Sequence, residues 1–299
     1  INECEGGAGV FQITEHDLSD VNKLPAKDGK YDWSRDHFGK PVFLTVSSQL
    51  QLEAISCALG AVYTTNKSFR SEHSSTYKHV SEFTHLEIED IFIELNDLMN
   101  IGERYIKYLA NYLLETCSNE LEGLNKFTSK GIVDRVKEIR EATFHRITHE
   151  DAIELLQNSD MKEKPQQGED LSSEAENWLT DYFKGPVFVT HWPISIKSFY
   201  MRQCDNGTCE SFDLLMPYKI GELIGGSMRE ENYDKLLSMM KQKGVDETKL
   251  KFYTDLRKFG TVPHGGFGLG VDRLCMMFTG MENIKDVIPF PVQYKNCEV

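Results

Sequence analysis

FRSEHSSTYKHVSEFTHLEIE, residues 69–89, decides the fold. A β-rich run ends at Arg70, a polar loop spans 71–81, and a second β-rich run covers 82–94, which together predict a long antiparallel hairpin. Arg70 stands at a strand end, where the planar guanidinium fork matches phosphate oxygens. Phe83, on the returning strand, can face Arg70 and stack on a base. Taken singly, these residues are more simply interpreted as an exposed Arg–Glu pair beside a core phenylalanine.

The sequence around the hairpin predicts helices that flank more strands. Ser47-Ser48 cap a helix that reaches Leu59 after a short β-rich run at 41–46, and an amphipathic helix covers 96–117. The segment 118–185 is helical and charged, and we interpret it as an insertion on the surface. Strands are expected at 186–190, 197–203, 210–215 and 221–229, and helices at about 230–243 and 247–257. Long hairpins with non-alternating helices indicate an α+β fold with a mainly antiparallel sheet flanked by helices.

A glycine-rich strand, HGGFGLG at 264–270, runs into a predicted helix at 271–280. Glycines at alternate positions let a ligand lie flat on the strand, because no side chain intervenes. Arg273 enters the helix on the same side. The spacing is not that of a P-loop, and a crowded strand packed closely on a helix explains the glycines equally well.

Two carboxylates lie at the ends of neighbouring strand segments, Asp213 and Glu222. Their oxygens can share a Mg²⁺ ion, since hard cations prefer oxygen ligands. A solvated acidic pair is the plainer alternative on spacing alone.

The composition bounds the classes of function. The 299 residues suit one large domain or two small ones, and the net charge of −14 repels a phosphate backbone, so any contact with nucleic acid requires a local basic patch or a further domain. Seven scattered cysteines fit reduced thiols, and Cys204 and Cys209, which flank a turn, are expected as free thiols rather than as a disulfide or metal pair. No apolar run approaches the roughly eighteen residues that cross a bilayer. The chain does not begin with Met, so we expect it to be part of something longer.

Taken together, the motifs resemble those of one enzyme family. FRSE (69–72) with EF (82–83), and GLGVDR (268–273) entering a helix, resemble motifs 2 and 3 of class II aminoacyl-tRNA synthetases. The stretches CEGGAGVFQ (4–12), KPVFLTVSSQLQLEA (40–54), GELIGGSMREE (221–231) and YTDLRKFGTVPHGGFGLG (253–270) are similar to asparaginyl-tRNA synthetases, in the same order. The resemblance covers nearly all of the chain and implies the class II catalytic fold.

The resemblance implies an ATP site on the hairpin and the glycine strand. Arg70 would hold the α-phosphate, Glu72 would read the adenine amino group, and Phe83 would stack on adenine. Lys78 and His79 would reach the outer phosphates, Arg273 would clamp the γ-phosphate, and Glu222 with Asp213 would bind Mg²⁺. The catalytic residues would be Arg70 and Arg273. The complete set of expected ATP-binding residues is Arg70, Ser71, Glu72, Lys78, His79, Val80, Phe83, Glu222, Gly270, Val271, Asp272 and Arg273.

The resemblance also implies an amino-acid site. Glu5, Gln49 and Glu87 match positions that hold the substrate α-ammonium group, and Arg229 matches the residue that contacts the side-chain carbonyl oxygen. Leu52 stands where aspartyl enzymes have a lysine, and Glu53 follows it. Because a carboxylate accepts from an amide NH₂ and repels a second carboxylate, Glu53 favours asparagine over aspartate. The expected amino-acid-binding residues are Glu5, Gln49, Glu53, Glu87, Gly225 and Arg229.

As a whole, the resemblance implies ATP-dependent activation of L-asparagine and its transfer to tRNA(Asn) by a homodimer in the cytoplasm, with an organelle as the alternative. Residues 1–299 would be the catalytic domain with an insertion at about 118–185, and we expect motif 1 and the N-terminal anticodon-binding domain to be absent from this chain. Two departures from the family pattern stand out. An arginine is missing after Phe290-Pro291, and Tyr218-Lys219 lengthens the connection before Glu222, which puts Asp213 in question as a metal ligand.

Two other functions remain open at this stage. A short paralogue would make asparagine from aspartate and ammonia through an adenylate, and ATP–pyrophosphate exchange with each amino acid separates it from a synthetase. A non-catalytic binding or signalling module with the same fold would keep its biological effect in an Arg70→Ala variant.

Overall fold

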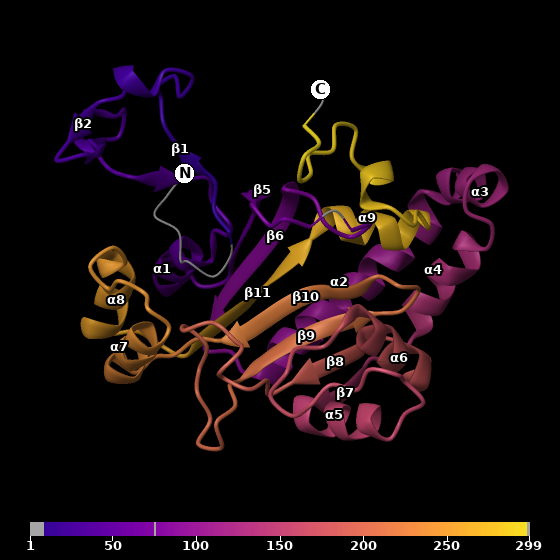
Figure 1. The fold of residues 1–299 in the computed structure, drawn as a ribbon. Helices are drawn as coiled ribbons and strands as arrows, with labels where there is room; N and C mark the ends of the chain where they lie inside the picture. The colour runs from indigo at the N-terminus through magenta and orange to yellow at the C-terminus, as the bar shows by residue number, and fades with distance from the viewer. Residues whose placement is uncertain (1–8, 75, 298–299) are drawn as a thin grey trace.

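A computed structural model describes residues 9–74 and 76–297, and a seven-stranded sheet forms its centre (Figure 1). The strand order is β5-β6-β11-β10-β9-β8-β7, and every neighbouring pair is antiparallel except β7 with β8. The strands of this sheet are β5 (Val62–Phe69), β6 (Glu82–Ile91), β7 (His145–Thr148), β8 (Val187–Thr190), β9 (Ser211–Met216), β10 (Gly221–Met228) and β11 (His264–Gly270). The predicted α+β fold with a mainly antiparallel sheet is confirmed.

Helices flank the sheet on both faces. They are α1 (Gln49–Leu59), α2 (Leu95–Thr116), α3 (Ser118–Phe127), α4 (Ile132–Glu141), α5 (His149–Gln157), α6 (Ser173–Phe183), α7 (Tyr233–Gln242), α8 (Lys251–Lys258), α9 (Val271–Thr279) and the 3₁₀ turn η3 (Ile284–Val287). No helix in the described ranges is long and apolar enough to span a bilayer.

One face of the sheet is apolar and forms the main core. Side chains alternate between the faces of a strand, so Leu86 and Ile88 of β6 share a face with Leu269 and Phe267, their register partners on β11. All four belong to or pack against a single core cluster, which also includes the fully buried Leu98 of α2. The hydrophobic effect therefore holds α2, α4 and α9 to this face.

The opposite face is polar and is organised by β6. His85, Glu87 and Glu89 alternate with the core residues and are all buried. Glycines stand opposite them in register on β11: Gly270 pairs with His85, Gly268 with Glu87 and Gly266 with Glu89. A row of buried polar groups facing glycines is the setting for a binding site rather than for a second apolar core.

The expectation that 118–185 lies on the surface is wrong for part of that segment. Val136 and Ile139 of α4 are at most 1% exposed and belong to the main core cluster. β7 forms an edge of the central sheet by parallel pairing with β8. The charged residues of α4 lie on its outer side and dominate its composition, although its apolar stripe is fully buried. Whether the segment is an insertion relative to the family stays a prediction.

The strand expected at 197–203 is also wrong. This segment makes only isolated bridges, Met201 with Arg229 and Gln203 with Cys209. The consecutive residues Phe199 and Tyr200 are both buried, which the alternation of a strand does not allow on a one-sided surface. Cys204 and Cys209 form no disulfide in the described part of the chain, as predicted.

Several predicted boundaries shift by a few residues. The run at 41–46 contains only the short strand β4 (Val42–Phe43), and the helices expected at 230 and 247 begin at Tyr233 and Lys251. Helix α9 begins at Val271, as predicted.

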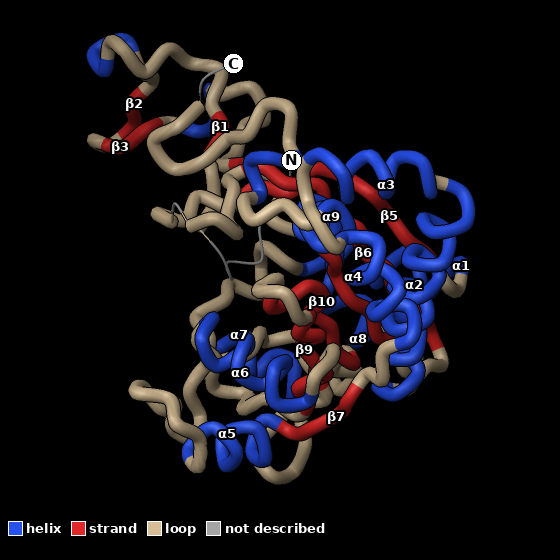
Figure 2. Tube along the Cα trace, turned by 90° about the vertical axis from the view of Figure 1, so that its right-hand side faces the viewer, coloured by secondary structure: helices blue, strands red, loops and turns tan. Residues whose placement is uncertain are grey.

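Residues 9–43 form a separate N-terminal lobe at one end of the molecule (Figures 1 and 2). Its elements are β1 (Gln12–Ile13), η1 (Val21–Lys23), β2 (Ala26–Lys27), β3 (Lys30–Tyr31), η2 (Trp33–Arg35) and β4 (Val42–Phe43). β1 pairs with β4, and β2 pairs with β3. Backbone hydrogen bonds tie its ends to the body, including Ser71 N donating to Gly9 O at 2.9 Å.

Candidate active site

A cavity of about 180 Å³ opens on the polar face of the sheet, between β6, the loop 71–81, β10 and the start of α9. We call it the larger cavity, because it adjoins a smaller one of about 140 Å³ that is described below. The lining of the larger cavity includes all the expected ATP-binding residues except Ser71 and Val271, and adds five residues that were not in that set, of which Gly225 was expected in the amino-acid site. The lining residues are Arg70, Glu72, Lys78, His79, Val80, Phe83, His85, Glu222, Leu223, Gly225, Gly268, Gly270, Asp272, Arg273 and Ile284.

Ser71 and Val271 point elsewhere. The Ser71 hydroxyl donates to the Val10 carbonyl oxygen at 3.3 Å, so it attaches the N-terminal lobe to the hairpin. Val271 packs against the main core at the first turn of α9. The strand-to-loop and strand-to-helix transitions turn both side chains out of the cavity.

Arg70 and Phe83 face each other across the hairpin. The guanidinium carbon of Arg70 lies 5.2 Å from the centroid of the Phe83 ring, a cation–π distance. The Nε atom of Arg70 is buried without a hydrogen-bond partner among the described residues. Because a buried unpaired donor costs about 1–3 kcal/mol, Arg70 is prepared to receive an anionic oxygen.

Arg273, at the start of α9, also lines the larger cavity. Its Nη1 donates to the carbonyl oxygen of Glu222, and its Nη2 lies 3.4 Å from the carbonyl oxygen of Lys78. The adjacent Asp272 accepts a hydrogen bond from the Thr84 amide at 2.6 Å, which fixes the start of α9 against β6. Two guanidinium groups from distant parts of the chain thus line one cavity.

Asp213 and Glu222 converge over Gly225. A Cβ atom at Gly225 would lie 2.9 Å from Glu222 Oε1 and 3.5 Å from Asp213 Oδ1, so the absence of a side chain makes room for both carboxylates. Lys197 Nζ lies 2.6 Å from the other oxygen of Asp213. Burial raises the pKa of Asp213 to about 7 although Lys197 opposes it. One oxygen from each carboxylate is available, which fits the oxygen ligands that Mg²⁺ prefers.

Glu176 is a neighbour of this group that the sequence did not reveal. Its Oε2 lies 3.7 Å from Lys78 Nζ, which is 5% exposed and has no hydrogen-bond partner within 9–74 and 76–297. Burial and the charge of Glu222 raise the pKa of Glu176 to about 7. Burial lowers the pKa of Lys78, because it disfavours the charged ammonium group. Glu176 belongs to α6, inside the segment interpreted as an insertion, and no motif there marked it.

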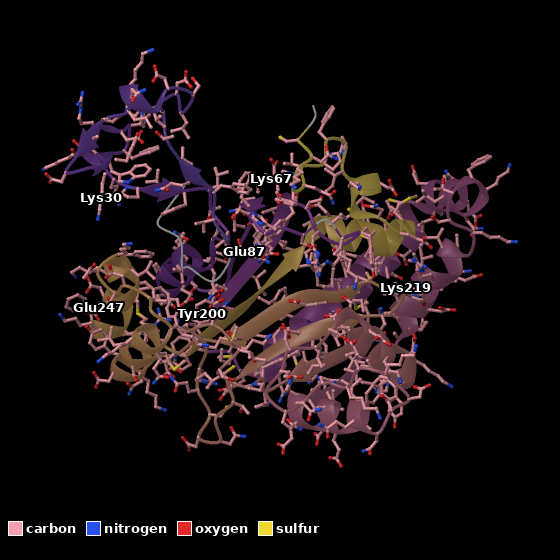
Figure 3. The ribbon with its side chains drawn as sticks, in the orientation of Figure 1. Lys30, Lys67, Glu87, Tyr200, Lys219 and Glu247 are labelled. Carbon is pink, nitrogen blue, oxygen red and sulfur yellow. The ribbon has the colours of Figure 1, made fainter. Side chains whose placement is uncertain are left out.

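A smaller cavity of about 140 Å³ adjoins the larger one. Glu87 and Tyr200, both labelled in Figure 3, belong to its lining. The two cavities share Arg70, His85, Glu222, Gly225 and Gly268. The other lining residues of the smaller cavity are Ser47, Gln49, Leu52, Glu87, Ile88, Tyr200, Arg229 and Phe267.

The expected amino-acid-binding residues have three different outcomes. Gln49, Glu87, Gly225 and Arg229 line the smaller cavity. The position of the Glu87 carboxylate is fixed by hydrogen bonds that it accepts from the Ser47 hydroxyl and from the Ser48 amide, the latter at 2.9 Å. Glu5 lies outside the described residues.

Glu53 does not line the smaller cavity, and the expectation that it faces the substrate amide is wrong in this structure. It is fully buried, and its oxygens accept from the Tyr253 hydroxyl at 2.8 Å and from Arg257 Nη2 at 2.5 Å. It also accepts from Gln49 Nε2 at 3.0 Å, four residues earlier on α1. Gln49 and Glu53 therefore share one face of α1, but Gln49 lines the cavity while Glu53, one turn further on, is covered by Tyr253 and Arg257 of α8.

The glycines of β11 make room for side chains of β6 and not only for a ligand. A Cβ atom at Gly266 would lie 2.9 Å from Glu89 Cδ, and one at Gly268 would lie 2.9 Å from His85 Cε1. His85 was not predicted as a site residue, and yet it lines both cavities. The alternation of His85, Glu87 and Glu89 along β6 was the signal that pointed to it.

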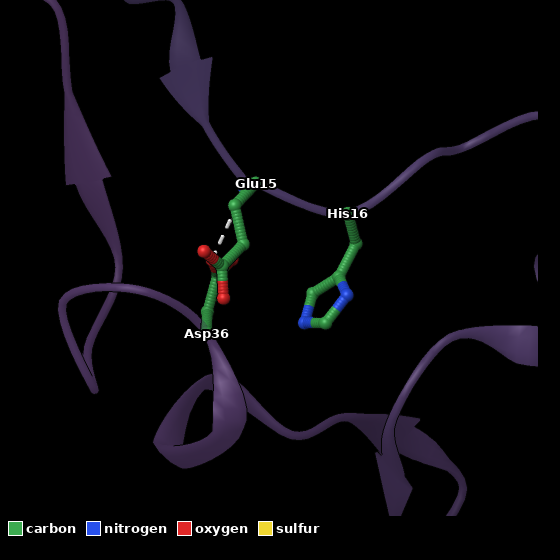
Figure 4. A group of neighbouring side chains, drawn as sticks. All are labelled: Glu15, His16 and Asp36. Atoms are coloured by element: carbon green, nitrogen blue, oxygen red, sulfur yellow. Dashed lines mark hydrogen bonds between the residues drawn. The ribbon is translucent and has the colours of Figure 1, made fainter.

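A second group of ligand-type side chains lies in the N-terminal lobe (Figure 4). One potential ligand atom each from Glu15, His16 and Asp36 lies within 4.8 Å of the others. However, Asp36 already accepts hydrogen bonds from the Tyr31 hydroxyl at 2.9 Å and from the His37 amide at 2.7 Å. These bonds account for its position, so we interpret the group as a structural polar centre of the lobe.

The chain is similar to known proteins over most of its length. A family model described as "tRNA synthetases class II (D, K and N)" matches residues 5–294. The chain is 44% identical to the "Probable asparagine--tRNA ligase, mitochondrial" of Dictyostelium discoideum, over 99% of the chain, and 46% identical to an "Asparagine--tRNA ligase" of Bacillus cereus, over 97%. The crystal structure of the Pyrococcus horikoshii asparaginyl-tRNA synthetase complexed with asparaginyl-adenylate superposes with a TM-score of 0.81 at 35% identity and covers 96% of the chain.

The chain spans only part of these relatives. It covers 63% of the length of both curated ligases and 60% of the crystallised Pyrococcus chain. The match therefore concerns the part that carries the two cavities.

Proposed function

Because the chain belongs to the family of class II tRNA synthetases (D, K and N), we propose that it activates L-asparagine with ATP and passes the activated asparagine to tRNA(Asn). The observation that carries this proposal is the junction of the two cavities at Arg70, whose buried Nε atom lacks a partner among the described groups. A nucleotide in one cavity and an amino acid in the other would meet at that guanidinium, where the mixed anhydride of an adenylate forms.

The larger cavity would bind ATP. Adenine would stack on Phe83, and Glu72 would accept from its amino group. Lys78, His79 and Arg273 supply positive or donor groups for the outer phosphates, and all three line the cavity. The asparagine carboxylate would attack the α-phosphorus in line, and pyrophosphate would leave.

This step needs no general base, because the nucleophile is already an anion. Catalysis then consists of positioning the reactants and neutralising phosphate charge, which Arg70 and Arg273 can provide because both line the larger cavity. Glu222 and Asp213 are the residues that would hold Mg²⁺, an ion that offsets phosphate charge when bound.

The smaller cavity would bind L-asparagine. Gln49 and Glu87 would hold the α-ammonium group, and Arg229 would donate to the side-chain carbonyl oxygen. Leu52 brings no positive charge to this cavity, which supports a neutral amide rather than a carboxylate as the preferred side chain.

The wider setting of the enzyme is also a proposal. We propose that the active form is a homodimer that works in the cytoplasm, with an organelle as the alternative, and that tRNA contacts depend on parts of the protein beyond this acidic chain. The net charge of −14 supports that dependence, because like charges repel the tRNA backbone.

ATP–pyrophosphate exchange with the full-length protein tests the proposal. We expect exchange that depends on asparagine and is much weaker with aspartate. Arg70→Ala should lower kcat/KM by about 100-fold or more, since a donor to the reacting phosphate is worth roughly 3–4 kcal/mol. Exchange with aspartate but not with asparagine would contradict the proposal, and aspartate with ammonia should yield no free asparagine.

A further inference from the structure

Glu176 is paired with a cation of the larger cavity, although it does not line that cavity itself. Its Oε2 atom lies 3.7 Å from Nζ of Lys78, and the two side chains are 16% and 5% exposed. Glu176 belongs to α6, whereas Lys78 belongs to the loop 71–81 and lines the cavity. The pair therefore connects the segment 118–185 to the residues that would bind the outer phosphates.

Gly221 provides the space for this pair. A Cβ atom at Gly221 would lie 2.7 Å from Lys78 Nζ and would also clash with Glu176 Oε2. The φ angle of Gly221 is +69°, in the left-handed region that favours glycine. Because Gly221 starts β10 directly before Glu222, the turn that leads to the expected metal ligand also admits the ammonium group and the carboxylate.

The ammonium group of Lys78 has no other ion-pair partner in the described ranges. Its Nζ atom is buried there without a hydrogen bond. The Arg273 guanidinium approaches Lys78 only at the backbone, with Nη2 3.4 Å from the carbonyl oxygen. Since a lysine side chain is long and flexible, the position of the ammonium group depends on Glu176 and on the ring of Tyr77, whose centroid is 5.5 Å away.

Burial makes this pair costly for the fold. It raises the pKa of Glu176 to about 7 and lowers the pKa of Lys78. Both shifts disfavour the charged forms, so at pH 8 the folded protein carries an ionised carboxylate that reduces its stability. Shifted pKa values of this kind concentrate at functional sites. An ion pair that costs stability and includes a cavity residue favours a functional role over a structural one.

We propose that Glu176 is a positioning residue, which holds the ammonium group of Lys78 in place to bind the outer phosphates of ATP and the pyrophosphate that leaves. A side chain held beforehand loses less conformational entropy when the phosphates bind. At 3.7 Å the carboxylate attracts the ammonium group without a hydrogen bond, and the three N–H groups stay available for phosphate oxygens. The inference rests on the proposed function, and Glu176 does not itself touch the substrate.

ATP–pyrophosphate exchange with the full-length protein at pH 8 tests this role. Glu176→Gln keeps the size of the side chain and removes its charge. We expect KM for ATP and KM for pyrophosphate to rise about 10-fold, while KM for asparagine stays at the wild-type value. The direction of the change is decisive, because removal of a negative charge near phosphates would by itself tighten their binding and lower both KM values.

A stability measurement separates this effect from misfolding. Because burial disfavours the ionised carboxylate, Glu176→Gln should be at least as stable as the wild type at pH 8 in urea unfolding. If Glu176→Gln does not fold, Glu176→Asp takes its place. The shorter side chain keeps the charge but draws it away from Lys78, so KM for ATP should again rise with KM for asparagine unchanged.

A double-mutant cycle tests whether Glu176 acts through Lys78. Lys78→Ala should itself raise KM for ATP, because it removes a group that would bind the outer phosphates. Once Lys78 is absent, Glu176→Gln has no ammonium group left to release, so the double variant should show no further rise over Lys78→Ala. Independent effects would instead multiply, and that result would overturn the inference.

Glu174→Gln is the matched control, since it is the same change at an exposed position of the same helix. We expect wild-type KM values for all three substrates.

The outcomes separate the inference from the proposed function. Wild-type exchange with asparagine, together with an unchanged or lower KM for ATP in a folded Glu176→Gln or Glu176→Asp variant, overturns the inference alone. Absence of exchange with asparagine in the wild-type protein overturns the proposed function, and the inference with it.

Discussion

At the scale of single residues, the site depends on glycines whose lack of a side chain leaves space for neighbouring side chains. The alternate glycines of residues 264–270 predicted either space for a ligand or a crowded strand packed closely on a helix. The structure assigns Gly266 to Glu89 and Gly268 to His85. A one-dimensional pattern marks where side chains are absent, but only the register of β6 against β11 says which group fills each space.

Gly266→Ala should therefore destabilise the protein and weaken asparagine binding together. The added Cβ would clash with the carboxylate of Glu89 and with the backbone carbonyl of Ile88, which cannot rotate away. Overpacking of this kind costs about 1–3 kcal/mol, measured as the free energy of unfolding in urea.

Gly270→Ala is the control on the same strand. A Cβ atom there would meet Arg273 Cβ at 3.8 Å, an ordinary contact. We expect little loss of stability, and equal losses for the two variants would contradict the assignment of Gly266 to Glu89.

Glu176 gives the protein a predictable dependence on pH. Its pKa is raised from 4.5 to about 7, chiefly by burial. A raised pKa means that the protonated group stabilises the folded state, so its contribution is complete below about pH 4.5 and is lost as the pH rises through 7. Glu176→Gln cannot ionise, and we expect it to gain up to ~3 kcal/mol over the wild type at pH 8 but only about 1 kcal/mol or less at pH 5.

Urea unfolding at the two pH values measures this difference. Glu174→Gln, an exposed change in the same helix, should show no such dependence. A loss of stability in Glu176→Gln at pH 8 would show that the ion pair with Lys78 outweighs the effect of burial.

At the scale of elements, strong hydrophobic periodicity in the sequence was sufficient to predict a helix or strand, and weak periodicity was not. The alternation of β6 and the apolar stripe of α2 predicted both elements close to their observed bounds. The segment 197–203 has the composition of a strand, but its fold follows from packing of Phe199 and Tyr200 into the cluster around α7 and α8. Tertiary contacts overrode local preference there. Glu53 was misplaced for a related reason, since its neighbours in space come from α8 and β11.

The position of α4 in the main core predicts a large effect of Ile139→Ala. Ile139 is 1% exposed and lies in the main core cluster. Truncation of a buried isoleucine costs about 2–5 kcal/mol, read from the midpoint and slope of urea unfolding.

Lys137→Ala, on the exposed side of the same helix, is the comparison. Its ammonium group pairs with Asp134 at 3.2 Å in solvent, and such pairs contribute about 0–1 kcal/mol. If both variants lose equally little, α4 does not belong to the cooperative core.

At the scale of the whole molecule, the body and the N-terminal lobe are held by different forces. Three apolar clusters stabilise the body, and within the described part of the chain none of them includes a residue before Leu50. The lobe relies on short strand pairs and on the polar centre at Asp36. Within the lobe, the sequence predicted only the short β-rich run that contains β4, because polar loops with few apolar residues carry little periodic signal.

Asp36→Asn should loosen the lobe without destabilising the body. Burial acts to raise the pKa of Asp36, but hydrogen bonds from Thr14, from two backbone amides and from Tyr31 lower it to about 2, so at neutral pH the group is a charged acceptor. We expect faster tryptic cleavage after Lys23, Lys27 and Lys30, with the main unfolding transition unchanged.

Glu15→Gln is the control for this variant. Glu15 uses its side chain only for an exposed contact with His37 at 3.3 Å among the described groups, so cleavage should proceed at the wild-type rate. Unchanged cleavage in Asp36→Asn would show that the lobe is stabilised in another way.

The even spacing of Phe83, His85, Glu87 and Glu89 along one strand has a consequence for the length of what can bind. Six residues of extended backbone separate Phe83 from Glu89, which accepts hydrogen bonds from Arg229, a span of ~20 Å that hydrogen bonds on both edges of β6 keep constant. In the function proposed above, an amino acid with one more methylene group, such as glutamine, would have to fit within the same interval. Rejection of the longer homologue would then follow from the paired backbone of β6 and would require no dedicated side chain.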